Sequence, residues 1–159
     1  MIKKLSHYDK SGRARMVDIS PKAHTKRTAV AHAFVKIRPE VLKQLPKNPK
    51  GDPLEVARIA GIVAAKKTSE LIPMCHAVML AHVDVEMKIE ARGVRIEALV
   101  TTTGPTGVEM EALTAVTVAA LTVYDMTKAL DKGIEITDIY LLMKTGGKSG
   151  DFARTVEVK

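Results

Sequence analysis

Three charged residues at the two ends of one apolar segment are of types that suit acid–base chemistry. Glu111 lies near the start of the segment, Asp125 and Lys128 lie near its end, and no charged residue separates Glu111 from Asp125. Asp125 and Lys128 stand three positions apart, so they are neighbours on a helix surface. A partly desolvated lysine beside a carboxylate can donate or relay a proton. On an open surface the same spacing gives only an ion pair, and both interpretations stay open.

The segment that carries these charges, residues 106–128, is predicted to be one long buried helix. Thr106 followed by Glu109 has the form of a capping box, which explains Glu109 without any further role. The middle of the segment is small and apolar nearly all round, which is typical of a buried helix. A charge buried at the end of such a helix is costly unless it is paired. The end charges, Glu111 above all, are therefore candidates for a site.

Glu111 and Asp125 are expected to point in similar directions but to lie far apart. A helix rises about 1.5 Å per residue, which separates the two carboxylates by roughly 21 Å. Their directions differ by roughly 40° at about 100° per residue. One small substrate cannot contact both ends of the same helix. The residues serve either two sites or, as we expect, one site assembled from two subunits of an oligomer.

A short loop adds a second group of candidates, Met74, Cys75 and His76, beside a proline. His76 could act as a general acid or base or contact a phosphate, although a single loop histidine is more often structural. Cys75 and His76, with His82 further on, do not match a zinc-binding spacing, and the chain has no second cysteine. Packing is a better explanation of Cys75 than metal binding.

The segment from Lys144 to Asp151, KTGGKSGD, has the composition of a phosphate-binding turn. Glycines expose backbone N–H groups, and Lys144 and Lys148 supply positive charge. It is not a Walker A loop, because Leu142 stands where that motif needs a glycine and no helix follows. A phosphate cradle and a flexible C-terminal turn are equally consistent with it. Lys50, just before a helix start, also suits an anion, although one exposed lysine usually serves solubility.

Hydrophobic periodicity predicts the order strand, helix, strand, strand, helix, strand. Period-two alternation marks a strand over 27–38 and a hairpin over 83–100, and a last strand is expected over 134–144. Asp52 followed by Pro53 begins a helix that runs to about residue 70. Its buried face is expected to be the stripe that contains Val56, Ile59, Ala60 and Val63.

This order predicts an α+β, ferredoxin-like βαββαβ fold, with an antiparallel four-stranded sheet and two helices on one face. The other face of the sheet must be exposed to solvent or covered, and because its strands are apolar we expect another subunit to cover it. We expect a single domain over 1–159, with irregular arms at 1–16 and 152–159.

The composition limits the kinds of partner that the protein could bind. The 159 residues carry a net charge of +7, which suits nucleic acid, an acidic membrane or a polyanionic small molecule. The charge is spread along the chain, which argues against a membrane partner. Aromatic residues make up only 3%, too few for stacking bases, so a basic ferredoxin-like nucleic-acid-binding module is the weaker alternative. A single cysteine and the lack of an apolar leader favour the cytoplasm.

Several long segments, in order and over nearly the whole chain, resemble the molybdenum cofactor biosynthesis protein C family of cyclic pyranopterin monophosphate synthases. The similar segments are MVDIS at 16–20, KGD at 50–52, ARIAGIVAAKKTSELIPMCH at 57–76, TGVEMEALTAVTVAALTVYDMTKA at 106–129 and KTGGKSGDF at 144–152.

The resemblance implies a lyase that converts 3′,8-cyclo-7,8-dihydroguanosine 5′-triphosphate to cyclic pyranopterin monophosphate and releases pyrophosphate. It implies no metal and no organic cofactor. It also implies a homohexamer, a trimer of dimers, with the active site between subunits and with neither a nucleic acid nor a membrane as partner.

The family's functional positions match residues of this chain. Its catalytic aspartate matches Asp125, with Lys128 beside it as acid–base partner. The residues that correspond to substrate contacts are Met74, Cys75, His76, Met110, Glu111, Lys50, Lys66, Lys144, Lys148 and Arg27. The chain departs from the family at Ala77, where proline is usual, and at Thr127, where cysteine is frequent.

Overall fold

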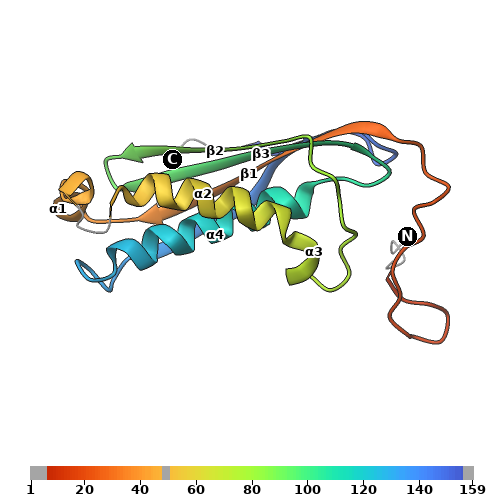
Figure 1. Ribbon diagram of the computed structural model, residues 1–159, viewed down its shortest axis with the longest axis horizontal. Helices are drawn as coiled ribbons and strands as arrows, with labels where there is room; N and C mark the ends of the chain where they lie inside the picture. The colour runs from red at the N-terminus through yellow and green to blue at the C-terminus, as the bar shows by residue number, and fades with distance from the viewer. Residues whose placement is uncertain (1–6, 48–50, 156–159) are drawn as a thin grey trace.

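The computed structural model describes residues 7–47 and 51–155, in which two long helices cover one face of an antiparallel sheet (Figure 1). The strands are β1 (Thr25–Lys36), β2 (His82–Glu90), β3 (Gly93–Gly104), β4 (Glu135–Thr145) and β5 (Phe152–Ala153). The helices are α1 (Pro39–Leu42), α2 (Pro53–Lys66), α3 (Thr68–Leu71) and α4 (Glu109–Thr127), with a 3₁₀ turn, η1, at Leu45–Lys47.

The strand order β2-β3-β1-β4-β5 confirms the ferredoxin-like α+β arrangement. The difference from the prediction is a fifth strand. Phe152 and Ala153, at the start of the predicted irregular arm 152–159, pair with Lys144 and Met143 of β4. A strand of two residues is too short for hydrophobic alternation to reveal.

Small residues let the helices approach the sheet closely. Ala29, Ala31 and Ala33 of β1 are fully buried beneath α4, and Ala115 and Ala119 of α4 are buried as well. Valine and isoleucine side chains of β2 and β3 fill the space around them. The core is therefore aliphatic, which is consistent with an aromatic content of only 3%.

Helix α2 begins as predicted, but the opposite face from the predicted one is buried. Asp52 caps the helix, with its Oδ1 accepting from the backbone N–H groups of Leu54 at 2.9 Å and Glu55 at 3.4 Å. The helix ends at Lys66, and α3 follows as a separate turn. The predicted stripe is wrong, because three of its four members, Val56, Ile59 and Val63, are exposed.

The buried face of α2 is instead made of small residues, which are Ala57, Gly61, Ala64 and Ala65. A Cβ on Gly61 would lie 3.0 Å from the backbone oxygen of Ala115 in α4, so the two helices pack almost backbone to backbone. Helix α2 carries two apolar stripes, and the sequence pattern alone does not tell which one faces the core.

Helix α4 is shorter than predicted at its start, and the capping box is wrong. Its N-cap is Val108, and no side chain caps it. Glu109 lies inside the first turn, where its Oε1 pairs with Lys144 Nζ at 3.2 Å. The helix ends at Thr127, and Gly133 lies in the turn that follows, where its backbone N–H donates to Asp131 Oδ1.

The two ends of α4 lie at opposite ends of the sheet (Figure 1). The start of β1 pairs with the end of β3 (Thr25 with Gly104) and with the end of β4 (Thr28 with Thr145). These strand ends lie beside the first turn of α4, where Lys144 reaches Glu109. The last turn of α4 lies beyond the other end of β1, where Asp131 bonds Arg38. Among the described residues, no helix is long and apolar enough to cross a membrane.

Candidate functional site

A cavity of about 350 Å³ lies at the N-terminal end of α4. It brings together five predicted site residues, which come from two segments more than 30 positions apart. Its lining comprises His7, Val17, Ile19, Lys22, Met74, Cys75, His76, Val78, Thr106, Gly107, Glu109, Met110 and Glu111. The loop after α3 and the first turn of α4 therefore form one site.

Glu111 is the buried charge of this cavity, with only 4% of its surface exposed. Burial raises its pKa, because a desolvated carboxylate is disfavoured, and the nearby Glu109 carboxylate raises it further. The hydrogen bond with the backbone opposes these effects in part. Glu111 therefore holds a proton more tightly than an ordinary glutamate, a property that suits a proton donor.

Cys75 has a protonated thiol in this setting. Burial raises the pKa of the thiol, and the negative charge of Glu111 raises it further. The thiolate is the nucleophilic form, and this environment suppresses it. Cys75 is thus suited to contact a ligand rather than to attack one.

His76 is held by a contact across 59 positions. Its Nε2 lies 2.8 Å from the carbonyl oxygen of Val17. A carbonyl can only accept, so Nε2 is the donor. The loop itself is anchored by backbone hydrogen bonds from Ile72 to Thr68 and from Cys75 to Ile72.

Sequence reasoning missed the part of the N-terminal segment that forms one wall of the cavity. His7, Val17, Ile19 and Lys22 all line it, although none of them was among the predicted site residues. Of the four, only His7 lies in the irregular arm expected at 1–16. The sequence did contain a signal, because apolar Val17 and Ile19 alternate with polar Asp18 and Ser20. In the structure Val17 and Ile19 are half-buried, whereas their neighbours are exposed.

Two predicted cations lie at the same end as the cavity. Lys144 contacts the cavity residue Glu109, as described above, and Arg27 lies at the start of β1. Gly146 and Gly147 have φ values of +85° and +86°, and the Arg27 guanidinium occupies the space where a Gly147 side chain would stand. Arg27 Nε is buried without a hydrogen-bond partner among the described residues.

The structure separates the remaining predicted lysines from this arrangement. Lys148 lies exposed in the turn after β4, and Lys66 is exposed at the end of α2. Lys50 lies outside the described residues. The glycine-lysine segment is an ordered turn around Arg27, stabilised by a 3.0 Å bond from Gly146 N–H to Asp151 Oδ1.

Asp125 and Lys128 lie at the other end of α4, far from the cavity. Lys128 Nζ donates to Asp125 Oδ1 at 2.6 Å, and the side chains are 52% and 62% exposed respectively. This hydrogen bond raises the pKa of the Lys128 ammonium. Of the two interpretations that the sequence left open, the single chain shows an exposed ion pair.

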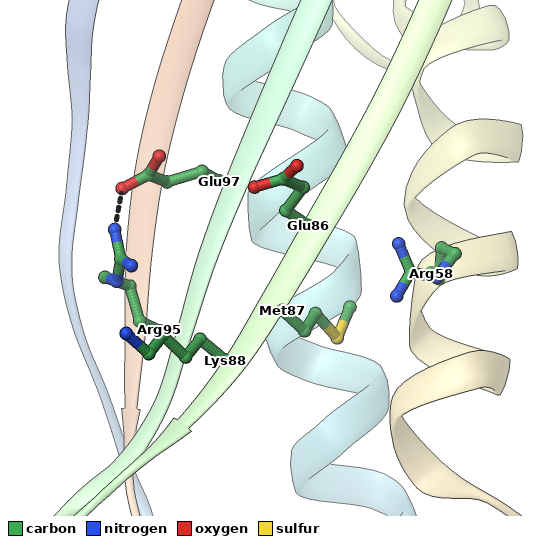
Figure 2. A pocket seen from close by; sticks show the side chains of 6 residues that line it. All are labelled: Arg58, Glu86, Met87, Lys88, Arg95 and Glu97. Atoms are coloured by element: carbon green, nitrogen blue, oxygen red, sulfur yellow. Dashed lines mark hydrogen bonds and ion pairs between the residues drawn. The ribbon is translucent and has the colours of Figure 1, made fainter.

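A second hollow, of about 390 Å³, contains none of the predicted site residues (Figure 2). Figure 2 shows Arg95 paired with Glu97 on β3, at 2.5 Å, while Arg58 approaches β2 from α2. Arg95 also pairs with Glu90, and Arg58 donates to the carbonyl oxygen of Val85. Arg95 is neutralised by Glu90 and Glu97, and Arg58 is paired with Glu55 at 3.0 Å, so the cavity at α4 is the better candidate site.

The chemistry available at the cavity is proton transfer and anion binding. Within residues 7–47 and 51–155, no three His, Cys, Asp or Glu side chains gather closely enough to hold a metal ion. A ferredoxin-like α+β fold with a buried carboxyl, a histidine and nearby cations defines a small protein equipped for acid–base chemistry on an anionic small molecule.

Comparisons with known proteins agree with this description. Residues 16–147 match the MoaC family. The chain is 59% identical to the cyclic pyranopterin monophosphate synthase of Corynebacterium glutamicum strain R, over 94% of this chain and 97% of the relative. It is 56% identical to that of Roseiflexus sp., over 93% and 96%, and 52% identical to that of Desulfitobacterium hafniense, over 98% and 97%. The chain belongs to the MoaC family.

Proposed function

We propose that this chain is a cyclic pyranopterin monophosphate synthase, a lyase of molybdenum cofactor biosynthesis. Its substrate is 3′,8-cyclo-7,8-dihydroguanosine 5′-triphosphate, and its products are cyclic pyranopterin monophosphate and pyrophosphate. The observation that carries the proposal is the buried Glu111 in one cavity with Met74, Cys75 and His76, in a chain whose relatives bear that enzyme's name.

The active site is assembled from two protomers. Glu111 and Asp125 lie about 21 Å apart along one helix, so one substrate cannot contact both in the same chain. The proposed catalytic pair, Asp125 and Lys128, is exposed at the C-terminal end of α4 and does not reach the cavity at the N-terminal end of the same chain. Placing the C-terminal end of a neighbour's α4 over the cavity completes the site and desolvates the pair.

Two exposed apolar surfaces support an oligomer, proposed here as a homohexamer built as a trimer of dimers. Val56, Ile59 and Val63 form an exposed apolar stripe along α2, and Leu121 of α4 is also exposed. The open face of the sheet bears a groove of about 500 Å³ with a largely apolar lining that includes Val30, Leu99, Leu142 and Met143. Exposed apolar patches of this kind commonly mark protein interfaces.

The cations bind the triphosphate. Arg27 and Lys144 lie at the cavity end, and Lys148 and Lys66 are exposed. Lys50 is proposed from the sequence resemblance alone. Pyrophosphate departs with growing negative charge on its oxygens, which positioned lysines and arginines stabilise. The net charge of +7 draws the polyanionic substrate toward the protein.

The ring rearrangement needs several proton transfers, and the residues proposed to carry them are Asp125, Lys128 and His76. Met110, Glu111 and the Met74–His76 loop hold the guanine-derived ring, and Glu111 in its neutral form can donate a hydrogen bond to it. Neither a metal nor an organic cofactor is part of this proposal. The single cysteine suits the reducing cytoplasm, where we place the reaction.

Incubation with the cyclic triphosphate tests the proposal directly. We expect stoichiometric pyrophosphate and a product with the mass of cyclic pyranopterin monophosphate, and no pyrophosphate from GTP under the same conditions. Absence of both products from a correctly folded oligomer would refute the proposed activity. Salt-dependent binding of mixed nucleic acid in place of turnover would favour the nucleic-acid-binding alternative.

A further inference from the structure

The N-terminal arm, defined here as residues 15–20, lies against the cavity with a regular alternation of side chains. Val17 and Ile19 line the cavity and are half-buried, whereas Met16, Asp18 and Ser20 are exposed. The arm is not part of the sheet, because the first strand, β1, begins only at Thr25. Its position therefore depends on contacts with the cavity and on its own turns.

Two turns hold the arm on either side of Val17. On one side, Arg15 N–H bonds the carbonyl oxygen of His7 at 2.9 Å, and Tyr8 forms a β-bridge with Ala14. On the other side, Asp18 Oδ1 accepts from Ser20 N–H at 2.9 Å and from Ser20 Oγ at 2.7 Å. The Val17 carbonyl thus lies in a segment that is held by hydrogen-bonded turns on both sides.

That carbonyl is the partner of His76 Nε2, at 2.8 Å. Because a carbonyl oxygen has no proton to give, the contact exists only when Nε2 carries one. In the neutral imidazole, Nδ1 is then the nitrogen with the lone pair. The arm thereby distinguishes the two nitrogens of a ring that lines the cavity.

We propose that the N-terminal arm, through the Val17 carbonyl, fixes the tautomer of His76 so that Nδ1 is the atom that exchanges a proton with the substrate. Nδ1 takes a proton from a substrate atom, the ring becomes the imidazolium with Nε2–H still bonded to Val17, and Nδ1 returns the proton in a later step. Val17 is a positioning residue, because it acts through His76. The catalytic half of this inference rests on the proposed function, whereas the tautomer does not.

Nuclear magnetic resonance of the full chain with ¹⁵N-labelled histidine measures the tautomer directly. The chain has five histidines, and the variant His76→Gln assigns the signal of His76. We expect a slowly exchanging ring N–H on Nε2 and an unprotonated Nδ1 in the unmodified protein. The double variant Val17→Gly, Ile19→Gly removes the side chains that seat the arm, and the Nε2–H signal should broaden or vanish.

Turnover of the same variants tests the catalytic half. A positioned acid or base is worth about 10²–10⁴-fold, so partial loss of its orientation should lower kcat by about tenfold with little change in KM. Met16→Gly is the matched control on an exposed arm position, and its signal and kcat should stay unchanged. Thermal unfolding of each variant establishes that the sheet and helices are intact.

Distinct outcomes overturn distinct claims. If Nδ1 rather than Nε2 carries the proton in the unmodified chain, the inference is wrong. It is also wrong if the double variant loses the Nε2–H signal but keeps the same kcat as Met16→Gly. Absence of pyrophosphate release by an unmodified chain with the expected His76 signal would refute the proposed function and leave the tautomer assignment in place.

Discussion

The two ends of α4 carry carboxylates in opposite environments. Glu111 in the first turn is almost fully buried, and its pKa is raised, whereas Asp125 in the last turn is well exposed and paired with Lys128. The N-terminal end has a cavity, an N-terminal segment that lines it and a glutamate with a raised pKa. The other resembles an ordinary surface ion pair. A catalytic role for Asp125 therefore depends on residues that a neighbouring chain places beside it.

Asp125→Ala gives the largest expected effect and tests this dependence. Loss of the proposed acid–base residue should lower the rate of pyrophosphate release by about 10²–10⁴-fold, while stability stays nearly unchanged because the side chain is exposed. Glu135→Ala is the matched control, because Glu135 is a similarly exposed carboxylate paired with Lys36 at 3.3 Å. A steady-state assay with a thermal melt measures both quantities.

Mixing variants sharpens the comparison between the ends. If one site uses the two ends from different protomers, combining Asp125→Ala with Glu111→Gln protein creates some sites in which both residues are intact. Activity should rise after subunit exchange above that of the Asp125→Ala parent, whose sites all lack the proposed acid–base residue. If mass spectrometry shows that subunits have exchanged but activity does not recover, the composite site is contradicted. Asp125 would then be only a surface residue.

The glycine turn beside the cavity gives the next effect in size. A Cβ on Gly147 would lie within 1.8 Å of Arg27 Nη1, whereas a Cβ on Gly150 would meet nothing within 4 Å. Both glycines have positive φ, so Gly147→Ala and Gly150→Ala share a backbone cost of roughly 1–2 kcal/mol. Only Gly147→Ala displaces Arg27, and it should raise KM by about tenfold, the equivalent of a weakened charge-assisted hydrogen bond. Equal KM values for the two variants would remove Arg27 from the site.

Glu111→Gln tests the buried end through stability rather than rate. The pKa of Glu111 is higher in the folded chain than in the unfolded chain, so its contribution is fully present at low pH and declines as pH rises past the ordinary glutamate value of about 4.3. The variant should therefore gain stability relative to the unmodified protein as the pH rises above about 4.3, until the carboxyl of the folded chain is fully ionised.

Chemical denaturation at several pH values measures the gain from Glu111→Gln. Exposed Glu86, on the outer strand β2, supplies the control Glu86→Gln, which should show no such trend. Parallel curves for Glu111→Gln and the unmodified protein would mean that the carboxyl is not perturbed and that the contrast between the two ends is smaller than the structure indicates.

The sequence predicted the order of the elements and the cluster around Glu111 but not the faces that the helices present. Asp52 and Pro53 start α2 as expected, because capping chemistry is local. The buried face of α2 depends on the backbone of Ala115 approaching Gly61, a tertiary contact that periodicity cannot reveal. The wall formed by Val17 and the partner of Glu109 are missed for the same reason, since both depend on residues distant in the chain.

The smallest expected effect concerns how the two long helices begin. Asp52 caps α2 through bonds to two backbone N–H groups, so Asp52→Ala should cost about 1 kcal/mol of stability. Thr106 caps nothing, because Val108 is the N-cap of α4, and Thr106→Ala should change stability by less than about 0.5 kcal/mol. Denaturant titrations of both variants measure the difference. A cost for Thr106→Ala as large as that for Asp52→Ala would restore the capping box, and it would place Glu109 back at the helix start instead of beside Lys144. The cavity end of α4 would then be organised by its own backbone, whereas the structure organises it by an ion pair to β4.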